Sequence, residues 1–137
     1  MKKRLDAEMQ QLKAEYKRKI YVNICSKEKV NARKREAMQK AHDTLQAERT
    51  PRLAKIMLLR TEMATLTEGD PKTAVLKAEI SNLETEITIL RNENDQRIHN
   101  IVNGAYRELS ALNTERRMIS ARYEDDKSKL LKEFGMN

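Results

Sequence analysis

Aromatic residues, glycine and proline are all scarce in this chain of 137 residues, which has four Tyr, one Phe, no Trp, three Gly and two Pro. Charged residues make up 36% of it. Turn-rich sheet domains need frequent Gly and Pro and many aromatic side chains, so this composition disfavours them and favours long helices. The sequence therefore predicts an all-α protein with a single domain.

Cysteine is nearly absent and long apolar runs are missing. Cys25 is the only cysteine, so no disulfide can form within the chain. Outside residues 20–25 no apolar run exceeds about four residues, whereas a membrane-spanning helix needs about 20. Lys2, Lys3 and Arg4 are not followed by the apolar stretch of a signal peptide. We expect a soluble protein in the cytoplasm or another reducing intracellular compartment, without membrane contact.

A short segment near the middle of the chain, Glu68-Gly69-Asp70-Pro71, has the residues of a turn between two helices. Gly69 can adopt the left-handed conformation that closes a helix. Asp70 can cap the next helix, and Pro71 suits its first position because it needs no backbone donor there. These residues predict one helix over about 2–68, a turn at 69–70 and a second helix over about 71–134.

Apolar residues of the two predicted helices match one another when the chain folds back at this turn. Residues whose numbers sum to 139 should then lie level, for example Leu59 with Ile80, Ile56 with Leu83 and Tyr16 with Tyr123. Along the first helix these residues recur at a mean spacing of about 3.6, the period of an α-helix. The sequence predicts a long, coiled-coil-like antiparallel hairpin over residues 1–137. Its core should be thin, because each helix buries one stripe.

Two residues interrupt the helical pattern. Pro51 inside the first helix lacks a backbone donor, which costs about 3 kcal/mol, so we expect a kink or a restart capped by Thr50. Gly104 can mark a second bend or a close approach by a partner. The stripe itself also contains polar residues, such as Asn94 opposite Leu45, and a buried polar residue can fix the register of two helices.

Several large apolar residues fall outside the stripe, and we interpret them as a surface for a protein partner or a second copy. They are Tyr21, Val22, Ile24, Leu53, Met57, Ile89, Val102 and Tyr106.

Positive charge is concentrated in the first half of the chain. Residues 1–68 hold 17 Lys and Arg against 9 Asp and Glu, a balance of +8, whereas residues 69–137 hold 11 against 12, a balance of −1. A basic cluster is formed by Lys27, Lys29, Arg33, Lys34 and Arg35. The stretch expected opposite to it, residues 104–112, contains only one acidic residue, Glu108. This cluster is a candidate site for nucleic-acid phosphates or for an acidic protein surface.

Catalytic chemistry has little support in this sequence. No phosphate-binding Gly loop is present, Cys25 has no neighbouring His, and two helices provide no pocket that excludes water. His42 and His99 should lie nearly level, yet a pair of His residues on long helices does not define a metal site. We predict a protein that is not an enzyme and has no catalytic residues, metal, cofactor or small-molecule substrate.

Two hypotheses on function follow. The first is a non-enzymatic structural or adaptor coiled-coil protein that self-associates or docks into a larger macromolecular assembly. It rests on the apolar residues outside the stripe. The alternative is a basic helical rod that binds or packages nucleic acid through its Lys and Arg cluster.

Overall fold

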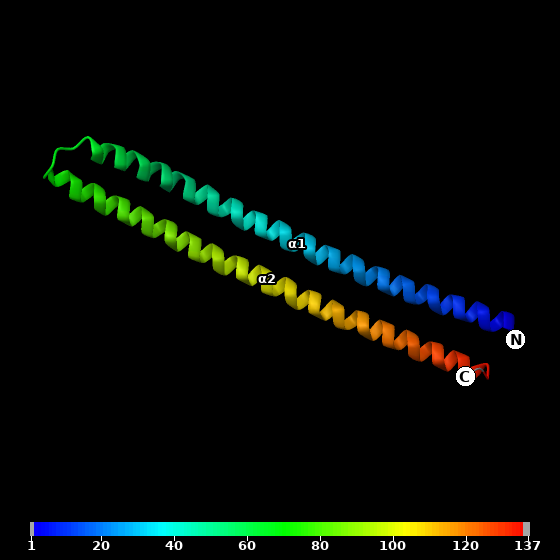
Figure 1. Cartoon of the computed structure of the whole chain (residues 1–137). Coiled ribbons are helices and arrows are strands. Elements are labelled where there is room, and N and C mark those ends of the chain that lie inside the picture. Colours follow the sequence, from blue (N-terminus) through cyan, green and yellow to red (C-terminus); the bar gives the residue numbers. More distant parts are fainter. Residues whose placement is uncertain (1, 136–137) are drawn as a thin grey trace. The chain divides into compact units, whose positions relative to one another are not determined.

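A computed structural model of the chain describes residues 2–135 and contains two helices (Figure 1). Helix α1 spans Lys2–Ala64 and helix α2 spans Pro71–Glu133, each with 63 residues. The described residues contain no strand, and the two helices pack against each other. The predicted all-α hairpin is therefore confirmed.

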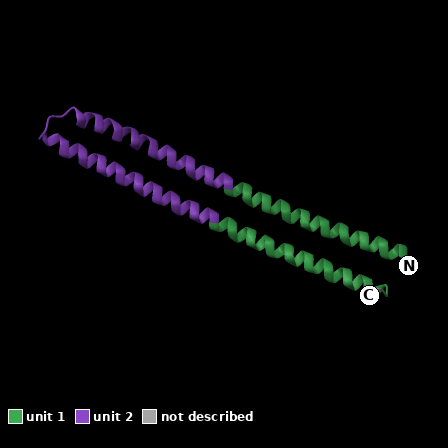
Figure 2. Ribbon diagram, viewed as in Figure 1, with its two compact units in different colours: residues 1–34, 103–137 green, residues 35–102 purple. Residues whose placement is uncertain are grey.

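The hairpin consists of two compact units (Figure 2). Unit 1 lies within Met1–Lys34 and Asn103–Asn137, and unit 2 is Arg35–Val102. Each unit contains one segment of α1 beside one segment of α2, in antiparallel order. Unit 2 also contains the loop between the helices.

The core of unit 2 lies next to that loop. Ile56 and Leu59 of α1 and Leu76 and Ile80 of α2 are buried together. The half-buried residues packed against them are Met63, Leu66, Leu83 and Ile87. Spacings of three and four residues keep each set on one helix face, so the stripe that the sequence predicts is the stripe that the fold buries.

Unit 1 has a sparser core. Leu5, Val30 and Ala105 are buried, and the rings of Tyr16 and Tyr123 stack across the two helices with their centroids 4.4 Å apart. The numbers of the two tyrosines sum to 139, so this contact confirms the predicted register in unit 1.

The loop differs from its prediction, because α1 ends at Ala64 and not at residue 68. The N–H groups of Thr65 and Leu66 bond to carbonyls three residues back, which tightens and ends the helix. Gly69 has a φ of 85° inside a turn closed by the N–H of Asp70 on the carbonyl of Thr67. Two packed helices lie about 8–10 Å apart, and the six residues between them cross this distance.

The start of α2 agrees with its prediction. The side-chain Oδ1 of Asp70 accepts a hydrogen bond of 2.9 Å from the N–H of Lys72, and Pro71 occupies the first helical position. The other end of α2, at Glu133, lies one residue from the expected position.

Neither of the two expected interruptions breaks a helix. Pro51 lies inside α1, which neither ends nor restarts at Thr50. Gly104 lies inside α2, and a Cβ atom added to it would meet no other atom within 4 Å. The space that a side chain at position 104 would enter is therefore open in the described residues. Among the described residues, no helix combines the length and apolar character needed to cross a membrane.

Candidate interaction surfaces

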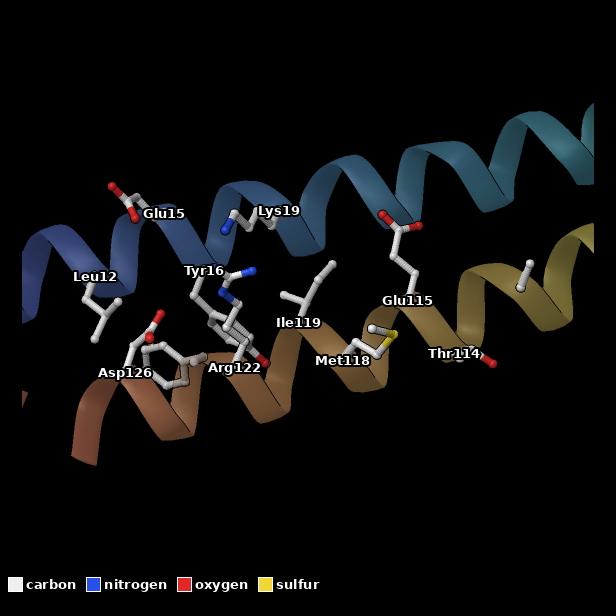
Figure 3. Close-up of a pocket in the computed structure, with 12 residues that line it drawn as sticks. Leu12, Glu15, Tyr16, Lys19, Thr114, Glu115, Met118, Ile119, Arg122 and Asp126 are labelled. Atoms are coloured by element: carbon white, nitrogen blue, oxygen red, sulfur yellow. The ribbon is translucent and has the colours of Figure 1, made fainter. Parts of the chain in front are cut away.

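A groove with a volume of about 610 Å³ runs along unit 1 between α1 and α2 (Figure 3). Its floor is mostly apolar, and charged side chains stand along its rim. The floor contains Leu12, Tyr16, Ile119 and Tyr123, and Met118 lies at its edge. The rim contains Glu15, Lys19, Glu115, Arg122 and Asp126.

Helical spacing places the floor residues on one side of each helix. Leu12 and Tyr16 are four residues apart on α1, as are Ile119 and Tyr123 on α2, so each pair shares one face. The hydroxyl groups of Tyr16 and Ser120 lie 3.2 Å apart and share a hydrogen bond, which fixes one Tyr ring against the other helix. The seam, the line along which the apolar stripes of the two helices pack, thus extends to the surface as the apolar floor of the groove.

The rim charges of the groove are of both signs and lie one helical turn apart. Glu15 and Lys19 share a face of α1, and Arg122 and Asp126 share a face of α2. Within residues 2–135 none of these four side chains forms an ion pair or a side-chain hydrogen bond. Their charges remain available for a partner.

All eight apolar residues predicted to lie outside the stripe are exposed. Among them, Met57 and Tyr106 are 72% and 70% exposed. The structure adds Leu58, Val75 and Met118, which the sequence analysis missed although they also fall outside the stripe. Met118 is 67% exposed and lines the groove of unit 1.

These exposed residues do not form one continuous surface. In unit 2, Leu53 and Met57 share the flank of Arg60, whose guanidinium lies 2.8 Å from the carboxylate of Glu84. Val75 lies four residues before Glu79, which pairs with Lys55 at 3.8 Å. Lys55 and Arg60 are five residues apart and so lie on opposite sides of the seam. Leu53 and Met57 therefore lie on one flank of unit 2, and Val75 lies on the other.

In unit 1, the exposed residues Tyr21, Val22 and Ile24 are close in sequence but point in different directions. Consecutive helical residues differ by about 100°, so these three side chains surround α1 at one height. The pKa of Tyr21 is raised above its usual value, mainly by a hydrogen bond with Cys25 and then by the negative charge of the Cys25 thiolate.

The residues of the basic cluster that the sequence predicted have different surroundings. Arg33 lies 3.5 Å from the carboxylate of Glu108, so part of its charge is balanced. Lys29 is exposed, whereas Lys27 and Lys34 are half-buried at the seam, seven residues apart. Arg35 belongs to unit 2 and is described apart from the other four.

A different basic site is present in unit 1. Lys27 lines a pocket of about 430 Å³ together with Arg116 and Arg117, and with Asn113 and Ser120. None of the three basic side chains has an ion-pair partner among the residues that the structure describes. The sequence analysis missed both arginines because it compared the cluster only with residues 104–112. Arg116 and Arg117 lie shortly after residues 104–112 and could have been found by extending the comparison.

No family model, no curated protein and no solved structure matches the chain. In the described part of the chain, no group of three or more His, Cys, Asp or Glu side chains is placed to hold a metal ion. The surfaces described above are therefore the basis for a functional proposal.

Proposed function

We propose that this chain is a non-enzymatic structural or adaptor coiled-coil protein, which self-associates or docks into a larger macromolecular assembly. The observation that carries the proposal is the apolar floor of the groove in unit 1, with Met118 exposed at its edge. Fully burying one such side chain contributes about 1.5–3 kcal/mol. The two helices leave Met118 exposed and Leu12, Tyr16, Ile119 and Tyr123 half-buried, so only part of this free energy is gained within the chain. A partner that covers the groove would recover the rest of this free energy.

The distribution of apolar residues supports the same proposal. Among the described residues, eight apolar side chains are buried and eleven large ones are exposed. An antiparallel pair of helices buries only one stripe of each, so further burial requires another chain. The single cysteine, Cys25, suits a reducing compartment such as the cytoplasm.

Size-exclusion chromatography with light scattering tests this proposal. We expect the full chain, with a monomer mass of 16.0 kDa, to form larger species as its concentration rises. Two variants divide the surface: one changes Tyr21, Ile24 and Met118 to Gln, and the other changes Leu53, Met57 and Ile89 to Gln. At least one of them should shift the association to higher concentration, because it removes apolar contact area.

The matched control changes three exposed residues outside these surfaces, Lys40, Arg91 and Lys132, to Gln. It should associate as the natural chain does. The proposal is wrong if the natural chain stays monomeric at every concentration and the tagged chain also retains no protein from extracts of its source cells.

A second candidate function is supported by the pocket that Lys27 forms with Arg116 and Arg117. Three neighbouring cations without an ion-pair partner would attract phosphate groups, and each phosphate contact releases condensed counterions from the nucleic acid. The candidate is a basic helical protein that binds the sugar-phosphate backbone of nucleic acid. The scarcity of aromatic residues provides few side chains on which bases could stack, so the sequence of bases would matter little.

A further inference from the structure

We infer that the groove of unit 1 binds the same groove of a second copy, with the two copies face to face and running in opposite directions. This inference rests on the proposed self-association and names its site, its partner and its orientation. It is carried by the charges on the rim of the groove.

Four of the five rim charges form an acidic pair, Glu15 with Asp126, and a basic pair, Lys19 with Arg122. The fifth, Glu115, lies beyond the basic pair and accepts a hydrogen bond from Asn23 (Figure 3). Tyr16 is level with Tyr123, since their rings stack, so Asp126 lies toward the same end as Glu15. Arg122 lies toward the end of Lys19 (Figure 3). One helical turn separates acid from base on each helix. Along the groove, two negative charges are therefore followed by two positive charges, with the stacked tyrosines between them.

Consider a second copy that faces the groove and runs in the opposite direction, with its stacked tyrosines over those of the first copy. This arrangement would place acidic side chains of one copy opposite basic side chains of the other. Glu15 would face the partner's Lys19, and Asp126 would face the partner's Arg122. Two-fold symmetry repeats both contacts, so four ion pairs would surround the tyrosines. In the opposite arrangement, with both copies running in the same direction, Arg122 would lie close to the partner's Lys19, and like charges would repel. The charge pattern thus selects the antiparallel arrangement.

Three neighbouring carboxylates already have contacts within the chain. The carboxylate of Glu115 accepts a hydrogen bond of 3.5 Å from the amide of Asn23. Asp125 pairs with Lys129 at 3.3 Å, and Glu8 pairs with Arg4 at 3.3 Å. The four rim charges that the dimer would use are those without such partners in residues 2–135.

A partner with charges of one sign would fit the groove less well. An acidic segment would meet Glu15 and Asp126 at one end, and a basic segment would meet Lys19 and Arg122 at the other. A second copy avoids both conflicts. In this dimer the apolar floor would provide most of the affinity, and the rim charges would fix the register and direction.

Charge reversal tests the inference. In one variant, Glu15→Lys and Asp126→Lys make all four of these charges positive. In a second, Lys19→Glu and Arg122→Glu make them negative. We expect each variant alone to dimerise about 10- to 100-fold more weakly than the natural chain at low salt, because like charges then face each other. An equimolar mixture of the two variants should restore dimers, and so should one chain that carries all four changes.

The matched control is Glu93→Lys with Asp95→Lys, which changes the net charge as the first variant does but lies in unit 2 on exposed side chains. Circular dichroism checks that each variant remains helical. A variant that loses its helices is replaced by the pair Glu15→Gln and Asp126→Asn, which should weaken the dimer because the four ion pairs can no longer form.

A measurement on the natural chain gives an independent test of orientation. Cys25 is the only cysteine, so one spin label per chain can be attached there. In the antiparallel dimer centred on Tyr16, the two labels are offset by about 18 residues, or about 27 Å along the helix axes at 1.5 Å per residue. In the same-direction dimer they are level.

The outcomes separate this inference from the proposed function. Labels that lie level, or single-sign variants that dimerise as tightly as the Glu93 and Asp95 control, would overturn the antiparallel dimer although the natural chain self-associates. A natural chain that stays monomeric would overturn it as well, and the proposed function would then be decided by retention of another protein.

Discussion

Two buried asparagines favour one register of the helices but lower the stability of the fold. Asn23 and Asn94 are 1% and 5% exposed, and the side-chain oxygen of each is buried without a hydrogen-bond partner. The amide of Asn23 donates a hydrogen bond of 2.9 Å to the backbone carbonyl of Leu112 on α2. Such a bond favours one register between the helices, while the unpaired oxygen lowers the stability of the fold.

The first prediction concerns Asn23. We expect Asn23→Leu to increase the free energy of unfolding by about 1–2 kcal/mol, because it removes a buried polar atom that has no partner. Urea unfolding followed by circular dichroism measures this change. Asn31→Leu, at an exposed position of the same helix, is the control and should change the value by less than about 0.5 kcal/mol. A decrease in the stability of Asn23→Leu would show that the bond to Leu112 outweighs the unpaired oxygen.

Asn23 also shows what sequence spacing can detect. It lies three residues after Ile20 and four before Lys27, so it falls on the predicted stripe. The prediction included Asn94 in the stripe and omitted Asn23. Which of its polar atoms would find a partner could not be predicted, because that depends on the distance to a carbonyl on the other helix.

At the level of the element, α1 contains a proline, Pro51, at which the sequence predicted a kink or a restart of the helix. Pro51 is exposed within a helix that continues on both sides. Its ring removes one backbone donor, and the stripe of apolar residues packs in unit 2 nevertheless. Tertiary packing therefore outweighs the local preference at this position.

The second prediction concerns this proline. We expect Pro51→Ala to increase the free energy of unfolding by about 1–3 kcal/mol, since it restores a helical hydrogen bond and a residue of high helix propensity. Urea unfolding again provides the measurement. Ser81→Ala, at an exposed position of α2, should increase it by only about 0.5 kcal/mol. If the free energy of unfolding increases equally in the two variants, the proline ring does not destabilise the helix, and this prediction is wrong.

At the level of the whole molecule, the charge is unevenly distributed. The chain has a net charge of +7, and the excess of positive charge lies in residues 1–68. The pocket of Lys27, Arg116 and Arg117 shows that the second half also contributes cations to a basic site. The sum of charges over each half could not reveal this, because it averages Arg116 and Arg117 with the acidic residues around them.

The third prediction tests this basic pocket. If the chain binds nucleic acid there, changing Lys27, Arg116 and Arg117 to Gln should abolish most retention of DNA and RNA in filter binding at about 50 mM salt. The dependence of log affinity on log salt should fall by about 0.7–0.9 for each phosphate that the variant no longer neutralises. A variant with Lys29, Arg33 and Arg35 changed to Gln tests the cluster that the sequence predicted.

The control for this prediction changes Lys40, Arg91 and Lys132 to Gln, which removes the same number of positive charges elsewhere. If all three variants bind equally, non-specific attraction to the net charge explains the binding, and the pocket has no special role.

The sequence by itself determined the two helices, the start of α2 and the stripe along which the helices meet. These follow from the 3.6-residue period and from Asp70 and Pro71, which act on their immediate neighbours. Tertiary structure alone decided where α1 ends, which charges remain unpaired on the groove and which cations join Lys27. The end of α1 depends on the distance that the loop must cross between the packed helices. The unpaired charges and the cations near Lys27 depend on distances between side chains of different helices, which the order of residues in one helix does not contain.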